Sequence, residues 1–435
     1  MNSIVIRAED KNIWEKRTPV IPVDLKEVID KTKSTAYVQT SSIRCFSDKE
    51  YKAQGAITCD DINAGDIIIG IKEIPEHKLL NDKVYLFFSH TIKGQSGGMP
   101  LLKKIMDSGS TLIDYERIVD ENNRRLIYFG RFAGDAGTLD ILWLLGEYWE
   151  HQGIHTPFIK CKQSTQYKSL NEAKESIVQI ANIIKREGID KAISPLVIGI
   201  LGYGNVASGA KEILDCLNVK MIKPNELSNI AEDCYGECNT IYFCEFREED
   251  LVKKKFGKPF DLQEYYKHPE NYVNVFDNYL PFLTVIINGV YWDKAYPNFV
   301  TWNGLKKLYE KNERPKLCGI ADISCDANGA IECNVKYTSI DHPAYLVDPI
   351  TREITDGWRG DGIVMLAVDN LPAELPYDSS TFFSNRLKKF LPNIIEANYQ
   401  NSLEQSGLCP EIKKAVIVYK GELTPEYEYL KKFIY

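Results

Sequence analysis

The sequence predicts an α/β fold with two Rossmann-like domains, whose parallel sheets lie around a central cleft. Short runs of β-branched residues alternate with amphipathic helical segments in the first part of the chain. A second series of the same kind begins with a continuous apolar run and a glycine-rich loop. The chain has 435 residues, which is long for one hydrophobic core. We expect one domain to comprise residues 1–135 with 370–435, and the other residues 136–369.

Strands and helices are predicted in order along the chain from apolar periodicity and from glycine and proline stops. In the first series we expect strands at 3–7, 36–38, 66–71, 84–88 and 111–113, and helices at 22–32 and 99–109. In the second we expect helices at 139–149, 171–187 and 207–217, and strands at 196–201, 219–222, 282–288 and 317–324. Residues 228–280 are more polar and aromatic, which favours a solvated excursion. A helix around 380–391 and an apolar run at 415–419 close the chain.

Charge and composition exclude several classes of protein. The formal net charge is -8, so the chain lacks the basic character typical of nucleic-acid binding. No signal-like or membrane-spanning apolar run is visible, and we expect a cytoplasmic protein. The eleven cysteines have no framework spacing and are expected to be free thiols. Cys234 and Cys238 form an isolated C-x3-C, so we expect no metal site.

The clearest motif is the loop Gly202-Tyr203-Gly204-Asn205-Val206-Ala207, which directly follows the apolar strand. Gly202 permits a tight turn, and Gly204 leaves room for a pyrophosphate. The small Ala207 lets the next helix pack close to the strand. The N-terminus of that helix, at Asn205 and Val206, offers backbone N–H groups to phosphates. The motif predicts dinucleotide binding, although turns also collect glycine for steric reasons alone.

The residue after the predicted strand at 219–222 bears on the choice of dinucleotide. An NAD site usually carries a carboxylate there for the ribose hydroxyls, whereas this chain has Lys223. A lysine favours the 2′-phosphate of NADP. Glu226 follows three residues later and leaves NAD open.

Polar residues gather at the ends of the predicted strands of the first domain, where ligands of open α/β sheets bind. They lie in Arg7-Ala8-Glu9 with Glu15-Lys16-Arg17, in Gly70-Ile71-Lys72-Glu73, in Phe88-Ser89-His90-Thr91-Ile92-Lys93, and at Arg124-Arg125.

In these stretches the sequence resembles the lysine-forming saccharopine dehydrogenases. It is especially similar to the lysine–ketoglutarate reductase half of aminoadipic semialdehyde synthase, and more distantly to alanine dehydrogenase. The resemblance runs in order over essentially the whole chain. The matching stretches are 7–10, 14–19, 69–72, 87–93, 112–116, 155–158, 267–270, 287–292, 321–324 and 369–372.

The resemblance implies that lysine and 2-oxoglutarate condense to an imine, which NAD(P)H reduces to saccharopine. It assigns the acid–base work to Lys72 and His90. A lysine among cations has a lowered pKa and can act as a base; Arg17 and Lys93 are the expected neighbours. His90 would otherwise be a satisfied core histidine, and Arg17 a surface charge.

The remaining roles are also implied by the resemblance. Arg125 would clamp a carboxylate of the oxoacid, with Lys93 as a second anchor and Arg17 beside the substrate. Glu73 and Glu116 would tune the charge of the site, unless they only decorate the surface. Asp369 would lie at the domain junction near the substrate, and Asp322 would border the nicotinamide.

Two departures from the family remain. The resemblance covers only the reductase half of the bifunctional enzymes, so we expect no counterpart of the second half, which oxidises saccharopine. Lys223 and the long 228–280 segment place the chain nearer the NADP-linked branch than the NAD-linked fungal enzymes.

The alternative functions are that of a related opine or amino-acid dehydrogenase acting on another substrate pair, and that of a non-catalytic dinucleotide sensor. The expected ligands are small molecules, without nucleic acid or membrane, and a homo-oligomer is compatible with this prediction.

Overall fold

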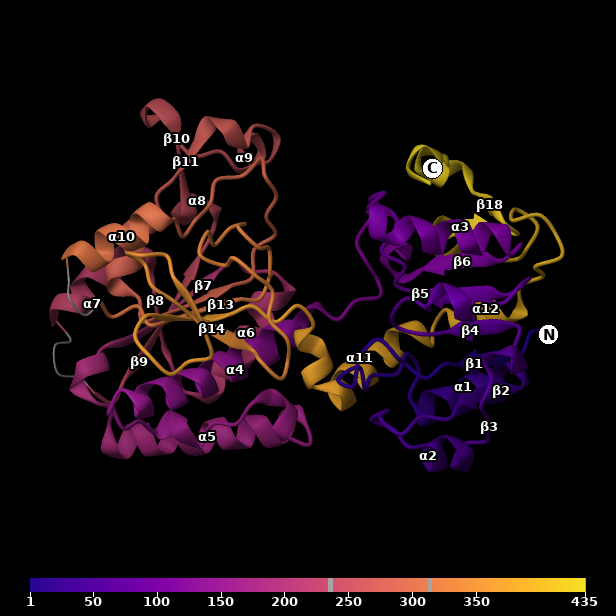
Figure 1. Ribbon diagram of the computed structural model, residues 1–435, viewed down its shortest axis with the longest axis horizontal. Coiled ribbons are helices and arrows are strands. Elements are labelled where there is room, and N and C mark those ends of the chain that lie inside the picture. The colour runs from indigo at the N-terminus through magenta and orange to yellow at the C-terminus, as the bar shows by residue number, and fades with distance from the viewer. Residues whose placement is uncertain (234–237, 312–314, 435) are drawn as a thin grey trace. The chain divides into compact units, whose positions relative to one another are not determined.

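The computed structural model describes residues 1–233, 238–311 and 315–434 (Figure 1). It divides into two compact units. Unit 1 comprises Met1–Phe129 and Pro376–Tyr435, and unit 2 comprises Gly130–Leu375. Each unit contains one eight-stranded sheet in which most neighbouring strands are parallel. The predicted α/β class with two mainly parallel sheets is confirmed.

Unit 1 is built on a sheet with the strand order β18-β17-β6-β5-β4-β1-β2-β3. The strands are β1 (Ile4–Ile6), β2 (Ala36–Gln39), β3 (Ile57–Cys59), β4 (Ile67–Ile69), β5 (Val84–Phe87), β6 (Thr111–Asp114), β17 (Val416–Tyr419) and β18 (Glu422–Leu423). The α-helices are α1 (Pro22–Thr32), α2 (Asp48–Ala53), α3 (Met99–Asp107), α11 (Pro376–Leu387), α12 (Leu391–Glu396) and α13 (Pro410–Ala415). Strands β1 to β6 are mutually parallel, and β17 and β18 are antiparallel additions at one edge.

Local sequence explains several boundaries in unit 1. Helix α1 begins with Pro22, whose fixed φ suits a first helical position. Helix α2 begins with a capping box, in which Ser47 accepts the N–H of Glu50 and Glu50 accepts that of Ser47. Strands β1 and β4 consist of aliphatic residues that are wholly buried, as expected of central strands covered on both faces.

Unit 2 has a sheet with the order β15-β14-β16-β13-β12-β7-β9-β8 and a separate two-stranded ribbon, β10-β11. The strands are β7 (Leu196–Leu201), β8 (Lys220–Ile222), β9 (Ile241–Phe246), β10 (Val252–Lys254), β11 (Tyr272–Asn274), β12 (Val285–Asn288), β13 (Gly319–Asp322), β14 (Ala344–Val347), β15 (Ile354–Asp356) and β16 (Ile363–Leu366). The α-helices are α4 (Gly130–His151), α5 (Leu170–Glu187), α6 (Asn205–Cys216), α7 (Leu227–Asp233), α8 (Glu248–Leu251), α9 (Leu262–Lys267) and α10 (Trp302–Lys311).

The expectation that residues 228–280 form a solvated excursion is wrong in one important part. Strand β9 lies within this segment, is buried along its length, and pairs with β7 over six residues. The apolar run from Ile241 to Cys244 is the signal for it, and the polar residues on both sides obscure that run. The ribbon β10-β11 and helix α9 are the part that projects from the sheet (Figure 1).

Other boundaries also differ from the prediction. The helix expected at 139–149 is α4, which begins at Gly130 and has 22 residues. The helix expected around 380–391 is two helices, α11 and α12. Strands β14, β15 and β16 were not predicted. Among the described helices, none combines the length and the apolar character needed to cross a bilayer.

Helices α4 and α6 pack at very close range through two glycines. A Cβ atom at Gly134 would lie 1.9 Å from the carbonyl oxygen of Val206, and one at Gly209 would lie 2.1 Å from that of Arg131. Real side chains do not tolerate such distances, so both positions must lack a Cβ. This contact fixes α6, whose N-terminus follows the glycine loop, against a long buried helix.

Candidate active site

The carboxyl edge of the unit 1 sheet has a topological switch point between β1 and β4. From β1 the chain adds β2 and β3 on one side, whereas β4, β5 and β6 continue on the other. Loops that leave the sheet at such a point separate and make room for a ligand. The loop after β1 carries Arg7 and Glu9, and the loop after β4 carries Lys72.

Buried ionic groups hold the backbone at Lys72. The Glu9 carboxylate accepts the N–H of Ile71 at 2.7 Å and the N–H of Lys72 at 3.0 Å. From the other side, Arg7 donates to the carbonyl oxygens of Lys72 and Glu73, each at 3.2 Å. Arg7 and Glu9 are both buried, so the loop is fixed by charge-assisted hydrogen bonds shielded from water.

Gly70 is required for this arrangement. A Cβ atom there would lie 2.7 Å from Cδ of Arg7 and 3.1 Å from a carboxylate oxygen of Glu9. Tyr115, which is fully buried, donates its hydroxyl to the Gly70 carbonyl at 2.9 Å. The loop that carries Lys72 is therefore anchored by two neighbouring segments, the loop after β1 and the turn after β6.

The Lys72 amine lies in a cationic and largely buried environment. Burial lowers the pKa of Lys72, and the charges of Arg17 and Lys11 lower it further, while Glu15 and Glu73 oppose them. Arg17 was an expected neighbour, but the second cation is Lys11. Lys93, the other expected neighbour, is exposed on the loop after β5. The lowered pKa makes the neutral amine, which can accept a proton, more accessible.

Arg17 is buried, which excludes the alternative of a surface charge. Its Nε and one terminal nitrogen donate to the two carboxylate oxygens of Glu15 at 2.7 and 2.6 Å. Its guanidinium also lies over the ring of Phe129, with Cζ 4.4 Å from the centroid. This bidentate and stacked arrangement orients Arg17 rigidly.

His90 is paired with Glu73 from the neighbouring loop. Nδ1 of His90 contacts the Oε1 carboxylate oxygen of Glu73. Burial would raise the pKa of Glu73, but the hydrogen bond and charge of His90 outweigh it and lower this pKa to about 2. Glu73 is therefore ionised and orients the imidazole ring of His90. The His90 residue itself has a positive φ of 52°. The half-exposed His90 is not a core histidine.

An open cavity of about 700 Å³ lies beside this pair. His90, Glu73 and Lys11 are among the residues that line it, and Lys72 is not. The cavity is large enough for a small substrate.

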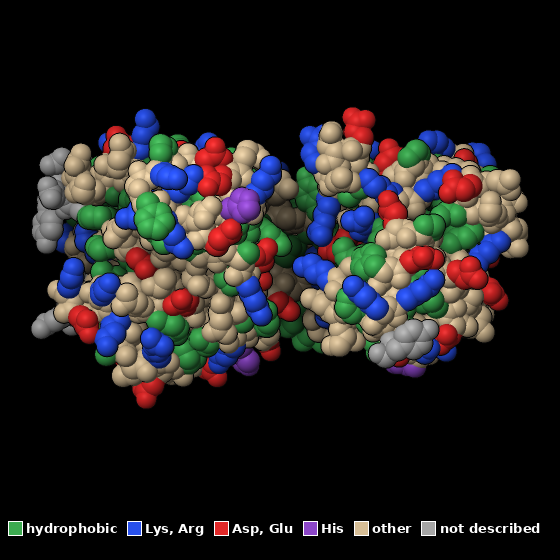
Figure 2. Space-filling view, turned by 90° about the horizontal axis from the view of Figure 1, so that it is seen from above, with side chains coloured by type: hydrophobic (Ala, Val, Ile, Leu, Met, Phe, Trp, Pro, Cys, Tyr) green, Lys and Arg blue, Asp and Glu red, His purple; other side chains and the backbone are tan. Residues whose placement is uncertain are grey.

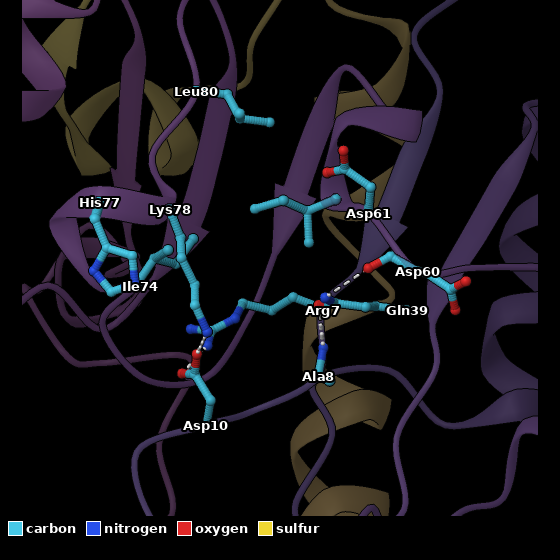
Figure 3. A pocket seen from close by; sticks show the side chains of 11 residues that line it. Arg7, Ala8, Asp10, Gln39, Asp60, Asp61, Ile74, His77, Lys78 and Leu80 are labelled. Atoms are coloured by element: carbon cyan, nitrogen blue, oxygen red, sulfur yellow. Dashed lines mark hydrogen bonds and ion pairs between the residues drawn. The ribbon is translucent and has the colours of Figure 1, made fainter.

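A second cavity of unit 1, of about 450 Å³, is lined by residues at the ends of β1, β2 and β3 and by residues between β4 and β5 (Figure 3). On one side of the cavity, Asp10 accepts a hydrogen bond from Lys78 at 2.6 Å and also pairs with Arg7. On another side, Gln39 links the loops after β1 and β3, because it accepts the Ala8 N–H and donates to the Asp60 carbonyl.

Arg125 and Glu116 form the last part of the predicted unit 1 site. One terminal nitrogen of Arg125 donates to Glu116 at 3.0 Å, and the Arg125 side chain is half exposed. The turn that carries Glu116 is held by Asp114, which accepts the Glu116 N–H at 2.7 Å and the Ser89 N–H at 2.9 Å. Arg125 thus combines a fixed edge with accessible nitrogens.

In unit 2 the glycine loop has the form that a dinucleotide requires. Gly202 has a φ of +92°, and its N–H donates to the Phe246 carbonyl of β9 at 2.9 Å. A Cβ atom at Gly204 would meet nothing within 4 Å, so the position opens onto free space. Helix α6 begins at Asn205 without a side-chain cap, so its first N–H groups are available to an anion.

A cavity of about 380 Å³ extends from this loop. It is lined by Gly202, Tyr203 and Gly204, by residues after β9 that include Glu248, and by residues after β12 that include Tyr291. The glycines and the helix N-terminus fit a dinucleotide pyrophosphate, and Gly202, Gly204, Asn205 and Val206 are the residues that would hold it.

Lys223 does not follow the strand that lies beside the glycine-loop strand. It is exposed and follows β8, the next strand in the sequence, but β9 lies between β8 and β7 in the sheet. Its N–H donates to Glu226 at 2.7 Å, so that carboxylate already has a local role. The strand next to the glycine loop ends with Glu245 and Phe246, and Arg247 follows.

The two predicted aspartates of unit 2 have different environments. Asp322, at the end of β13, is buried and accepts from Asn288 at 2.8 Å and Asn334 at 2.7 Å. Burial raises its pKa to about 6. These contacts join the ends of β12 and β13. Asp369 lies three residues after β16 and is exposed.

The described residues contain no group of three or more His, Cys, Asp and Glu side chains arranged to hold a metal ion. The described cysteines other than Cys238 are free thiols, and Cys234 lies outside the described residues. On the face shown in Figure 2, basic and acidic side chains are interspersed on both units.

A unit with a glycine loop and a parallel sheet, joined in one chain to a second α/β unit with a lysine, a histidine and arginines at its switch point, defines the class of two-domain dinucleotide-dependent dehydrogenases. The chain belongs to the alanine dehydrogenase/PNT family. The model of the family's N-terminal domain matches residues 5–136, and that of its C-terminal domain matches residues 318–426.

Named relatives point in the same direction. Over 99% of its length, the chain is 34% identical to the "alpha-aminoadipic semialdehyde synthase, mitochondrial" of Bos taurus and 36% identical to the alpha-aminoadipic semialdehyde synthase of Arabidopsis thaliana. It covers 47% and 41% of those proteins, so it spans about half their length or less. The NAD(+), L-lysine-forming saccharopine dehydrogenase of Yarrowia lipolytica is 26% identical, with 90% of this chain and 91% of that protein covered.

Solved structures show the same fold. An L-alanine dehydrogenase is similar over 100% of both chains with a TM-score of 0.64 and 17% identity. A transhydrogenase from Sinorhizobium meliloti gives a TM-score of 0.58 with 12% identity, covering 97% of this chain and 100% of that one. The two-domain Rossmann-type fold predicted from the sequence is confirmed.

Sequence reasoning did not assign roles to several residues that shape these sites. Glu9, Glu15 and Lys11 act on Lys72 or Arg17, and Arg247 adjoins the glycine loop. Glu9 and Glu15 stand in stretches already recognised as polar, so their proximity to the site had a signal. No sequence signal identifies Arg247, because its position depends on the spatial order of the strands.

Proposed function

We propose that this chain catalyses the NAD(P)H-dependent condensation of L-lysine and 2-oxoglutarate to saccharopine, or the reverse reaction. One observation supports this most: Lys72 and the His90–Glu73 pair occupy adjacent loops at the carboxyl edge of unit 1, in a chain whose unit 2 has a dinucleotide loop. The relatives with these names cover nearly all of the chain. Unit 1 is the proposed substrate domain and unit 2 the dinucleotide domain.

The proposed chemistry needs two proton-transfer groups. Neutral Lys72 takes a proton from the substrate ammonium, and the free amine attacks the keto carbon of 2-oxoglutarate. Protonated His90 gives a proton to the carbonyl oxygen as the amine attacks, and it then takes a proton from the nitrogen of the carbinolamine. It passes this second proton to the hydroxyl group, which leaves as water, and a protonated carbon–nitrogen double bond forms. The bound dinucleotide supplies hydride to the carbon of that bond. In the reverse direction the same groups run the proton transfers backwards.

Substrate carboxylates need cationic partners in unit 1. We assign Arg125 as the bidentate clamp because its side chain is half exposed while Glu116 fixes one terminal nitrogen. Arg17 and the exposed Lys93 are the further proposed anchors, and Glu73 and Glu116 set the charge around them. In unit 2, Asp369 is the proposed substrate neighbour. Asp322 supports the nicotinamide end through the strand ends that it joins.

For the cofactor we propose NADP, with NAD as the alternative. Strand β9, which lies beside the glycine-loop strand β7, is followed directly by a cation, Arg247. Cations there favour a 2′-phosphate, whereas a free carboxylate favours ribose hydroxyls.

A substrate panel tests the function. Purified protein should oxidise saccharopine with NADP or NAD and should leave alanine and other opines unreacted. Turnover of another opine without saccharopine would support a related dehydrogenase instead. Binding of NADPH with no turnover of any substrate would support a dinucleotide sensor.

The catalytic assignment is tested by Lys72→Met and His90→Gln. Each should lower kcat by about 100-fold or more, because positioned acid–base groups contribute roughly 10²–10⁴-fold. NADPH affinity should stay within about twofold, since both residues lie in unit 1 and the loop lies in unit 2. Unchanged kcat in both variants would remove this assignment.

A further inference from the structure

In doubly wound dinucleotide folds, the residue that reads the adenosine ribose stands at the end of the strand adjacent to the glycine-loop strand. Here β9 pairs with β7 up to Leu201 opposite Phe246, and the Gly202 N–H donates to the Phe246 carbonyl. Arg247 is the next residue and therefore stands directly beside the loop. Strand β8 is one strand further out, with Ile222 opposite Cys244.

The Arg247 side chain is held on one edge and one face. Its Nε donates to Glu245 at 3.1 Å, and its Cζ lies 4.9 Å from the ring centroid of Tyr203 in the glycine loop. Its side chain is 58% exposed, and its terminal nitrogens donate to no side chain or carbonyl among the described residues. A guanidinium fixed in this way presents two free nitrogens in the fork geometry that suits a phosphate.

Glu245 cannot serve as the ribose carboxylate in this arrangement. Its side chain is only 5% exposed, and both of its oxygens are engaged, one by Arg247 and the other by Lys211 of α6. The Glu245 carboxylate is therefore shared between two cations.

Two of the three carboxylates that follow Arg247 have contacts of their own. Asp250 accepts the Arg247 backbone N–H at 3.0 Å. Glu248 accepts from the hydroxyl of Tyr266 at 2.7 Å and from that of Tyr203 at 3.4 Å. Glu249, beside Glu248 in the first turn of α8, is the remaining carboxylate of this turn.

We propose that Arg247, oriented by Glu245 and stacked on Tyr203, binds the 2′-phosphate of NADP and sets the dinucleotide preference of this chain, whereas Lys223 does not. This inference rests on the proposed function only in that unit 2 binds a dinucleotide. It adds the residue that discriminates between the two cofactors.

The experiment compares NADPH and NADH binding by fluorescence titration at one fixed salt concentration, without substrate. Arg247→Gln should weaken NADPH about 10- to 100-fold, the loss expected for a charge-assisted hydrogen-bonded phosphate contact, and change NADH by less than about twofold. Arg247→Lys, which keeps the charge, should lose less. Lys223→Gln removes the same charge one strand further out and should leave both affinities within about twofold.

Three results would overturn the proposal. These are wild-type protein that prefers NADH, an Arg247→Gln variant that weakens both dinucleotides equally, and a selective loss in Lys223→Gln. Circular dichroism melting of each variant separates a binding loss from unfolding, and adenosine 2′-phosphate as competitor should lose affinity for Arg247→Gln only. Failure of the proposed function has a different signature, because saccharopine would then not react although NADPH binds.

Discussion

Replacement of Glu9 by glutamine would remove one of the two hydrogen bonds that Glu9 makes to the backbone at Lys72. Glu9 accepts two backbone N–H groups, from Ile71 and Lys72, at 2.7 and 3.0 Å. A glutamine has one acceptor oxygen, and its amide nitrogen would face the second N–H as another donor. One of the two hydrogen bonds is therefore lost, and a buried donor is left without a partner.

The magnitude follows from the charge and burial of these groups. A hydrogen bond to a charged group contributes about 1.5–3 kcal/mol, and Glu9 is buried, so solvent does not replace it. We expect the melting temperature of unit 1 to fall by roughly 5 °C. Because the backbone of Lys72 moves, kcat should fall by about 10- to 100-fold, the cost of a small misplacement of a catalytic group.

The assay measures saccharopine oxidation, thermal unfolding and NADPH affinity on the same preparation. Ser47→Ala is a matched control, because it removes the cap of α2 in the same unit and should cost about 1 kcal/mol without changing kcat. Two results would refute the reasoning: a Glu9→Gln variant with unchanged kcat, or one whose rate loss is matched by Ser47→Ala.

Three further predictions concern charge and packing. Lys11→Gln should raise the pKa of Lys72, because the Lys11 charge helps to lower it, and should therefore move the acidic limb of the pH profile of kcat/KM to higher pH. The control variant Lys49→Gln removes an exposed charge elsewhere and should leave the profile unchanged. Identical profiles for the two variants would count against the assignment of Lys72 as the base. Burial raises the pKa of Asp114 to about 6 from 3.8, so its contribution to stability is full below pH 3.8 and is lost as the pH rises through 6. The unfolding free energy of the wild type relative to Asp114→Asn should therefore fall by about 3 kcal/mol between about pH 4 and pH 7 in urea titrations, and a flat difference would contradict the burial effect. Gly209→Ala should destabilise unit 2 by about 1–3 kcal/mol, because its Cβ meets the Arg131 carbonyl, whereas Gly204→Ala should keep stability and weaken NADPH; urea unfolding and titration separate the two, and the reverse pattern would be inconsistent with this packing.

The parts of the fold predicted best from the sequence are those with strong local signals. Strand β7, the glycine loop and helix α6 follow one another as an apolar run, a turn that needs glycine, and an amphipathic segment. The unit 1 strands are short but consist of β-branched residues in a regular alternation with helices. Strand β9 was missed because its apolar run is brief and lies within a polar and aromatic segment.

The candidate site shows the same limit. Lys72, His90 and Arg125 were identifiable because each follows a strand or stands in a recognisable stretch. The cation beside Lys72 is Lys11 and not Lys93, since loops from separate strands meet at the switch point in a way that sequence spacing does not encode. Likewise, the order of strands in the sequence is β7, β8, β9, whereas their order in the sheet is β7, β9, β8. The sequence alone therefore indicates Lys223, which follows β8, and not Arg247, which follows β9.

The most direct test of the central claim is NADPH oxidation in the presence of L-lysine and 2-oxoglutarate, each alone and both together, with the product identified by mass spectrometry. We predict oxidation only when both substrates are present, with saccharopine as the product and with the activity lost in Lys72→Met. Oxidation with 2-oxoglutarate or another oxoacid alone, or a product other than saccharopine, would contradict the proposed function.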